Sequence, residues 1–500
     1  MFGFTANFYA RLRRQAGLVP ALRDGPAARP PERLLQAIWQ HQRLLRDRLR
    51  TADGQPVSVL HPGFRNAEAG PDFRDAVIQF GDEPPRSGDV EIDLEASGWQ
   101  AHHHAGNPAY AKVLLHVTWA ASGAATPALP TLPLADALDA PLAELAVCLG
   151  SEGAPPLPER FLGRCEAPLR DLASAETGEL LRQAAQVRLE SKAAAFRARA
   201  RQAGWEQVLW EGLFRALGYK NNVWPMLRLA ELRDRWQTPD ATAQSLQARL
   251  LGVGALLPAE LTRAQTGADD YLRRVWDQWW RERDGFSDCL LPRPLWHFAN
   301  LRPANHPQRR LALASHWLAD GHLPDRLERW LAADLAGSAA ERGLSEAFQV
   351  GEDEFWSWHW TLRSARLPKA QPLVGAQRVT DLAVNVVLPW LWSRAAEGGQ
   401  ETLRQRVERR YFDWPAAEDN ARLKLARQRV LGGAHRDVMR GAAAQQGLMQ
   451  ILSDFCDHSD AVCGQCRFPQ LVRDWRAAAP EARTLAGRTE ETEARMTNDE

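Results

Sequence analysis

The stretch GPDFRDAVIQFGDEPPRSGDVEID, residues 70–93, decides the fold of the N-terminal part of this chain. Two runs rich in apolar and β-branched residues, at 76–80 and 90–94, flank a loop at 81–88 that contains glycine and proline. Runs of this length bounded by such turn residues are typical of β-strands joined by a short connection. The stretch therefore predicts two strands that pair antiparallel through the loop.

The segments on either side extend this unit. Residues 32–50 place Leu34, Ile38 and other apolar side chains at helical spacing, which predicts a helix before the strands. Further strands are expected at 57–60 and 113–119. A helix, three strands, a connection and a fourth strand describe a small α/β layer.

The rest of the chain has a different character. A stretch rich in Pro, Gly and Ala at 122–158 predicts a linker or an edge strand, and amphipathic periods then recur from 176 to about 450. The expected fold class is α+β, with a small N-terminal α/β sheet domain followed by a large, mainly α-helical region. The expected parts are a flexible segment at 1–29, the sheet domain at 30–160, a helical region at 161–450 with up to two subdomains, a Cys-rich motif at 451–475 and a disordered tail at 476–500.

Size and composition limit the possible functions. Five hundred residues exceed the roughly 250 to 300 at which a single core stops growing, so two or three domains are expected. With 62 basic and 62 acidic residues, no global field draws the chain to nucleic acid or anionic lipid. The start lacks a secretory signal, and no apolar run approaches the roughly 20 residues that span a bilayer. We expect a cytoplasmic protein with no membrane segment.

Carboxylates gather on the predicted strand pair. Asp72 opens one strand, and strand alternation puts Glu91 and Asp93 on the same face of the next. Antiparallel pairing brings Asp72 toward Glu91. Two carboxylates with a backbone carbonyl form a hard oxygen site that suits Mg²⁺ or Mn²⁺, and such an ion can activate water and neutralise charge on a phosphate.

This arrangement resembles the PD-(D/E)XK nuclease superfamily, in which a helix carrying a glutamate precedes a sheet with Asp on one strand and Glu-x-Lys on the next. The resemblance implies that Glu32 is the helix glutamate and that Asp72 and Glu91 are metal ligands. Asp93 stands where the superfamily has lysine. Lys112, which enters the fourth strand, is the nearest candidate to replace that lysine, and Glu32 and Asp93 would assist.

Histidines follow the acidic strands closely. His102 to His104 come after Trp99, and His116 lies in the fourth strand. Imidazole beside carboxylate suits Zn, Mn or Fe, so His104 and His116 are candidate metal ligands. The alternative is that the triplet decorates an exposed turn and His116 is a core residue.

Longer strings resemble the bacterial family known as domain of unknown function 2851, over roughly residues 30 to 470. That family has no established activity, and it tends to carry histidine where this chain has Asp93. The strings that carry the resemblance are LLQAIWQHQRL (34–44), HPGFRNAEAGPDFRDAVI (61–78), GDVEIDLEASGWQAHHH (88–104), AYAKVLLHVTW (109–119), LFRALGYKNNVWPMLRLAE (213–231) and LRPANHPQRRLALAS (301–315).

Three of the six cysteines cluster near the C-terminus, as Cys456, Cys463 and Cys466. Their spacing resembles the first three ligands of the C-x6-C-x2-C-x5-C iron–sulfur motif, whose fourth place here holds Val472. An iron–sulfur cluster would need a distant fourth ligand, whereas a Zn²⁺ site could use His458. Three reduced cysteines without metal are the remaining alternative.

The leading hypothesis is a metal-dependent nuclease, or a nuclease-like protein that processes DNA or RNA, in which the helical region grips the substrate. Two alternatives remain: a non-catalytic nucleic-acid-binding or scaffold protein on a degenerate nuclease fold, and a metal hydrolase of a small phosphoester. Tryptophans interleaved with arginine in the helical region could stack bases, although core packing is the favoured interpretation.

Overall fold

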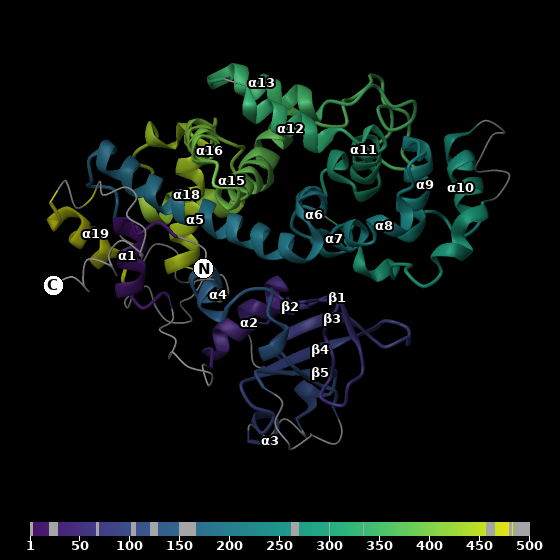
Figure 1. Cartoon of the computed structure of the whole chain (residues 1–500), viewed down its shortest axis with the longest axis horizontal. Coiled ribbons are helices and arrows are strands. Elements are labelled where there is room, and N and C mark those ends of the chain that lie inside the picture. The colour runs from purple at the N-terminus through teal and green to yellow at the C-terminus, as the bar shows by residue number, and fades with distance from the viewer. Residues whose placement is uncertain are drawn as a thin grey trace. The chain divides into compact units, whose positions relative to one another are not determined.

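The structure, a computed structural model, describes residues 4–19, 29–66, 70–101, 107–120, 129–149, 167–261, 270–299, 301–333, 335–456, 466–479 and 483. The chain is α+β as predicted, with a sheet in the N-terminal part and a largely helical region after it. It divides into two compact units (Figure 1). Unit 1 consists of residues 1–198 and 412–500, and unit 2 consists of residues 199–411.

Six strands of the described residues form one sheet in unit 1. The order is β1-β3-β4-β5-β6, with β2 paired to β3, and it joins an antiparallel half, β1 to β4, to a parallel half, β4 to β6. The four predicted strands are confirmed, and β6 is an edge strand within the Pro/Gly/Ala-rich stretch. The strands are β1 (Val57–His61), β2 (Phe64–Arg65), β3 (Phe73–Phe80), β4 (Arg86–Asp93), β5 (Val113–Thr118) and β6 (Thr131–Pro133).

The pairing of β3 with β4 brings the start of one strand beside the end of the other. Phe73 pairs with Val90, and the register then shifts before Ala76 pairs with Gly88. β3 therefore has one more residue than β4 in this interval, and Asp75 lies in the resulting bulge. Its φ of 57° is in the left-handed region, and its backbone N–H donates to Asp89 Oδ1 at 3.1 Å. Such a bulge bends a strand locally and redirects its side chains.

Helix α2 (Glu32–His41) packs on β4 and on α4 (Leu142–Leu149). Its apolar face is buried, and Trp39 Nε1 donates to the carbonyl of Pro62 at 2.9 Å. The prediction of a helix to residue 50 is wrong beyond residue 41. Gln42 adopts φ 50° and ends the helix, and Leu44 then forms a β-bridge with Leu138.

A short connection crosses from β4 to β5 and makes those strands parallel. It contains α3 (Gly98–Ala101) and a 3₁₀ turn, η1 (Pro108–Tyr110). A parallel pair requires a crossover of this kind, because a tight hairpin can join only antiparallel strands.

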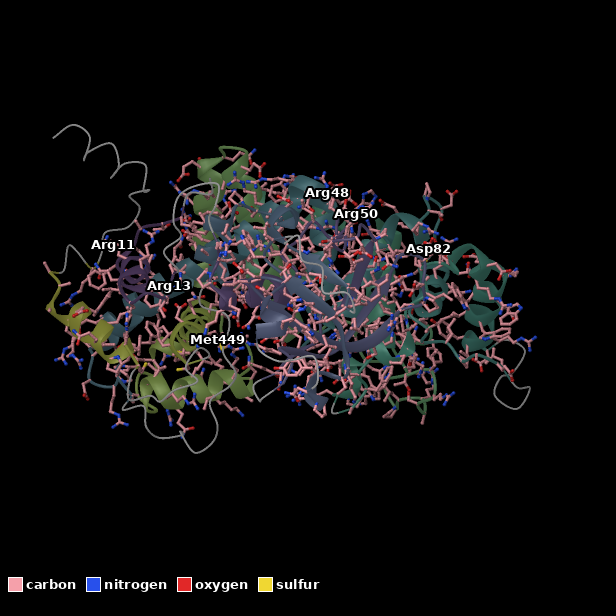
Figure 2. All side chains as sticks on the ribbon, turned by 90° about the horizontal axis from the view of Figure 1, so that it is seen from below. Arg11, Arg13, Arg48, Arg50, Asp82 and Met449 are labelled. Atoms are coloured by element: carbon pink, nitrogen blue, oxygen red, sulfur yellow. The ribbon has the colours of Figure 1, made fainter. Side chains whose placement is uncertain are left out.

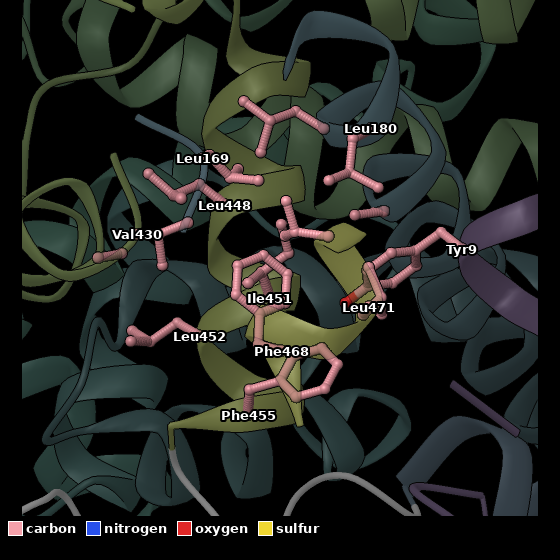
Figure 3. Close-up of a cluster of buried hydrophobic side chains, with 14 of the residues drawn as sticks. Tyr9, Leu169, Leu180, Val430, Leu448, Ile451, Leu452, Phe455, Phe468 and Leu471 are labelled. Carbon is pink, nitrogen blue, oxygen red and sulfur yellow. The ribbon is translucent and has the colours of Figure 1, made fainter. Parts of the chain in front are cut away.

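A hydrophobic core of unit 1, apart from the sheet, is built from helices near both ends of the chain (Figure 3). Four helices supply most of its side chains, among them Tyr9, Leu180, Ile451 and Phe468. The helices are α1 (Phe8–Gln15), α5 (Ser174–Ala203), α18 (Ala442–Phe455) and α19 (Phe468–Ala477). The expectation that 1–29 is a flexible segment therefore does not describe residues 8–15, because Tyr9 is fully buried.

Unit 2 is helical, and fully buried tryptophans such as Trp236, Trp317, Trp356 and Trp390 fill its interior. Of the tryptophans interleaved with arginine at 276–280 and 356–360, Trp279 and Trp356 are buried, as core packing predicts. The other four are less buried: Trp276, Trp358 and Trp360 are partly buried, and Trp280 is 45% exposed. Its helices are α6 (Trp205–Leu217), α7 (Val223–Glu231), α8 (Arg233–Trp236), α9 (Ala243–Val253), α10 (Tyr271–Glu282), α11 (Pro307–Asp320), α12 (Leu323–Ala332), α13 (Gly337–Phe348), α14 (Ala376–Leu382) and α15 (Leu388–Glu397). The chain returns to unit 1 within α16 (Glu401–Asp413), and α17 (Ala421–Ala426) belongs to unit 1.

The surface mixes both signs of charge. Figure 2 shows nitrogen-tipped and oxygen-tipped side chains interspersed, with Arg48, Arg50 and Asp82 labelled among the exposed ones. This matches the equal numbers of basic and acidic residues in the sequence. Within the part of the chain that the structure describes, no helix has the length and apolar character needed to cross a bilayer.

Candidate functional site

Asp72 and Glu91 meet at the junction of β3 and β4. The backbone N–H of Asp72 donates to Glu91 Oε2 at 3.1 Å, and the N–H of Ile92 donates to Asp72 Oδ2 at 3.1 Å. Each carboxylate thus accepts a hydrogen bond from the strand that carries the other. The convergence of these two side chains, predicted from the strand pairing, is present in the structure.

Helix α2 adds a glutamate and a glutamine to this junction. Gln36 Nε2 donates to Asp72 Oδ1 at 2.9 Å and to Glu32 Oε1 at 3.1 Å. Gln36 Oε1 in turn accepts a hydrogen bond from Arg65 Nη2 at 2.9 Å. The buried Gln36 therefore links the helix glutamate, the Asp72 carboxylate and a cation of β2 in one chain of hydrogen bonds.

The pKa values of the two central carboxyl groups are raised strongly. Burial, followed by the negative charge of Glu32, raises the pKa of Asp72 to about 7. Burial, followed by the charge of Asp72, raises the pKa of Glu91 to about 8, and Asp93 adds to both shifts. Hydrogen bonds from the backbone and the charge of Arg65 act in the opposite direction but are weaker. Asp72 and Glu91 are thus desolvated and also repelled by the charges of Glu32 and Asp93.

Asp93 is held by a histidine on the neighbouring strand. Asp93 Oδ2 and His116 Nε2 are 2.9 Å apart, and both side chains are buried. His116 lies opposite Glu91 in the β4–β5 register and packs against the ring of Trp99. Its Nδ1 is buried and has no hydrogen-bond partner among the described residues.

Glycine is required next to this pair. A Cβ on Gly98 would lie 2.5 Å from Cγ and 2.6 Å from Oδ1 of Asp93. No side chain fits there unless the Asp93 carboxylate moves. The start of α3 therefore helps to fix Asp93 in place.

Tyr110 contributes a hydroxyl group near the carboxyl groups. Burial and then the charges of Glu91, Asp72 and Asp93 raise the pKa of Tyr110, so its hydroxyl stays protonated at neutral pH. Its ring packs edge-on against Trp99 at 6.0 Å between centroids.

Lys112 does not join the cluster in the structure. It is exposed, and within the described residues its one recorded hydrogen bond is through its backbone carbonyl, which accepts from Asp89 N–H at 2.8 Å. The cation that favours the charged form of Asp72 is Arg65. The replacement of the missing lysine by Lys112 stays a prediction without support from its position.

The other predicted ligands are only partly described. His104, His458 and Cys463 lie outside the described residues. Cys456 at the end of α18 is buried in the core shared with α1 and α19, and Cys466 packs against the same core. The metal assignment at these cysteines stays a prediction.

The donor chemistry of the acidic cluster fits a hard divalent cation. Carboxylate oxygens are the ligands that Mg²⁺ and Mn²⁺ prefer, and a bound cation would relieve the repulsion that raises the two pKa values. Within the described ranges, no three His, Cys, Asp or Glu side chains already stand close enough together to enclose an ion. Side-chain rotations would be required to close a coordination shell.

Sequence reasoning missed Gln36, Arg65 and Tyr110. Gln36 follows Glu32 by four residues, so both lie on one face of α2, and that spacing was a usable signal. Arg65 lies in β2, a two-residue strand with too short a pattern to predict. Tyr110 reaches the cluster only through the crossover, which sequence alone does not trace.

The fold and the site define a chain with an α+β unit, in which helix α2 and the mixed sheet together carry four neighbouring carboxyl groups, and a helical unit. The chain belongs to the family described as "Protein of unknown function (DUF2851)", whose model matches residues 32–420. No curated protein and no solved structure matches it.

Proposed function

We propose that this protein is a metal-dependent nuclease, or a nuclease-like protein that processes nucleic acid, and that it hydrolyses phosphodiester bonds in the bacterial cytoplasm. The reciprocal hydrogen bonding of Asp72 and Glu91 across β3 and β4 carries the proposal. Glu32 and Asp93 lie close enough to shift the pKa of both groups. The order of helix, antiparallel strands, crossover and parallel strand supports the PD-(D/E)XK resemblance.

Asp72 and Glu91 would hold Mg²⁺ or Mn²⁺, with Glu32 and Asp93 assisting. When bound, the cation supplies Lewis-acid stabilisation of charge on a phosphate and a more acidic water. Gln36 orients the Asp72 carboxylate, and His116 holds Asp93. Arg65, the cation near Asp72, offers positive charge in a site that lacks the lysine of the superfamily.

The test is a cleavage assay of the purified full chain on single-stranded DNA, duplex DNA and RNA with Mn²⁺. We expect cleavage by the natural protein and loss of roughly a hundredfold or more in Asp72→Ala, since even partners behind a metal ligand are worth 10- to 100-fold. The metal content of both proteins is measured by elemental analysis.

Asp75→Asn is the matched control. Asp75 lies on the same strand, is exposed, and has a left-handed φ that asparagine tolerates. Its activity should equal that of the natural protein. Equal activity in Asp72→Ala would remove the assignment of Asp72 as a ligand.

A second candidate is a nucleic-acid-binding or scaffold protein without turnover. Two observations favour it. Asp93, at the position of the superfamily's lysine, is hydrogen-bonded to His116, and Lys112 is exposed and does not join the cluster, so the site lacks the usual lysine. It predicts binding to DNA or RNA that weakens with salt, and no product with any divalent metal.

A further inference from the structure

Two sequence motifs that the proposed nuclease site does not use meet in unit 2. The first, Leu217 to Asn222, is the turn between α6 and α7, and the second, residues 302–310, leads into α11. The hydroxyl of Tyr219 donates to Asn305 Oδ1, which joins the two motifs. Gly218 is required at the turn, because a Cβ there would lie 2.3 Å from the carbonyl oxygen of Asn222.

Two buried arginines lie at this junction. Arg310 is 5% exposed. Its Nη1 donates to the carbonyl of Leu373 at 2.8 Å, and its Nη2 donates to Asn305 Oδ1 at 2.8 Å and to the Tyr219 hydroxyl at 3.2 Å. Arg378 of α14 is 9% exposed, and its guanidinium carbon lies 3.5 Å from the centroid of the Tyr219 ring. The guanidinium carbon of Arg310 lies 5.7 Å from the same centroid.

The donors of the Arg378 guanidinium group are poorly used. Each guanidinium has five N–H donors, yet within the described residues Arg378 makes one hydrogen bond, to the carbonyl of Ala216 at 3.3 Å. Its acidic neighbour, Asp381, is 3.5 Å away and 42% exposed. The Nε atoms of Arg310 and Arg378 are buried and have no partner in the described part of the chain.

A nearby buried arginine has more hydrogen-bond acceptors than Arg378. Arg309, 1% exposed, donates to the carbonyls of His359, Gln371 and Pro372, all at 3.0 Å. That arrangement explains Arg309 as a clamp on the 359–372 segment. Arg378 has one carbonyl acceptor, that of Ala216, and buried cationic donors without acceptors are costly.

We propose that Arg310, Arg378, Tyr219 and Asn305 form a binding site for a phosphate group. Burial and the charge of Arg378 lower the pKa of Arg310, and burial lowers the pKa of Arg378, so an anion would relieve both. Guanidinium donors match phosphate oxygens in pairs. Exposed Lys220 and Arg302 on the same two loops add positive charge, which favours phosphate over a singly charged carboxylate. The site is independent of the acidic cluster and of the proposed nuclease activity.

The experiment measures binding of inorganic phosphate to the full chain by titration calorimetry, at constant ionic strength in chloride. We expect Arg378→Gln to weaken phosphate binding roughly ten- to a hundredfold, the loss typical of hydrogen bonds to a charged group. Arg366→Gln is the matched control, because Arg366 lies in the same unit, stacks on Trp358 at 4.0 Å and is exposed. Its affinity for phosphate should be unchanged.

Lys220→Gln keeps the proposal testable if Arg378→Gln fails to fold. Lys220 is exposed, so this variant should fold, and we expect a several-fold loss of phosphate affinity. Competition with a mononucleotide 5′-monophosphate and with a dinucleotide that has no terminal phosphate shows whether the site takes a phosphomonoester or a backbone phosphodiester. No binding above that of chloride, or equal losses in Arg378→Gln and Arg366→Gln, would overturn the proposal.

Discussion

The carboxyl group of Asp72 accepts hydrogen bonds from Ile92 N–H and Gln36, yet its pKa is raised to about 7. Burial and the charge of Glu32 therefore outweigh the hydrogen bond from the backbone and the charge of Arg65. Burial and the charge of Asp72 likewise raise the pKa of Glu91 to about 8. Near pH 7 the pair holds protons that the same side chains would release in the unfolded chain.

This sets the sign of a pH effect on stability. Because the folded pKa values of Asp72 and Glu91 lie above their ordinary values of 3.8 and 4.5, the folded chain binds more protons than the unfolded chain from about pH 4 to about pH 8. Without divalent metal, the free energy of unfolding should fall as pH rises through that window, by at most about 1.4 kcal/mol per pH unit for each proton.

Urea denaturation at several pH values checks this, with Asp72→Asn as the variant. The substitution removes one titrating group and its repulsion on Glu91, so the free energy of unfolding should decline less steeply with pH. Asp75→Asn serves as control and should follow the natural protein. A decline of the same steepness in Asp72→Asn would show that other groups cause it.

At the level of helices and strands, local sequence patterns predicted the sheet well. β1, β3, β4 and β5 carry runs of β-branched and apolar residues between turn residues, and the alternation that puts Glu91 and Asp93 on one face comes from that pattern. The end of α2 was not predictable, because Leu44 continues the helical spacing but pairs with Leu138, a residue far along the chain. Tertiary pairing overrode local propensity there.

Helix α1 shows the same limit, since its role depends on residues more than 400 positions away. The Tyr9 hydroxyl donates to Asp454 Oδ2 at 2.6 Å, and Arg13 Nε lies 2.9 Å from the same oxygen. Asp454 is fully buried in α18 and also accepts from Gln450 at 3.1 Å. A buried carboxylate of this kind needs all its donors.

Tyr9→Phe should therefore destabilise the protein. It removes one donor to a buried charge and leaves the packing in place, so we expect the free energy of unfolding to fall by about 1.5 to 3 kcal/mol. Chemical denaturation followed by tryptophan fluorescence measures this. Gln15→Ala at the exposed end of α1 should change stability by less than about 0.5 kcal/mol. If Tyr9→Phe left the free energy of unfolding unchanged, the hydrogen bond from α1 to Asp454 would contribute little to stability.

For the whole molecule, the sequence did not reveal that unit 1 is discontinuous. Residues 1–198 and 412–500 form one compact unit, with residues 199–411 as the other, so the linear division at about residue 160 misses the return of the chain. Helical periodicity can indicate that a segment is a helix, but it carries no information on which helices share a core. The packing of α1 with α18 and α19 in one core is what places both ends of the chain in unit 1.

The two proposed sites lie in different units, so their ligands should leave separate marks on the full chain. Hydrogen exchange with Mn²⁺ should protect residues 72–93 of unit 1, and exchange with phosphate should protect residues 216–222 and 302–310 of unit 2. A ligand at 100 times its Kd stabilises the state that it binds by about 2.7 kcal/mol, which such measurements resolve. Asp72→Asn should cancel only the first effect and Arg378→Gln only the second. Protection spread evenly over both units by one of the ligands would contradict the site assigned to that ligand, because a specific site slows exchange first in the residues that form it.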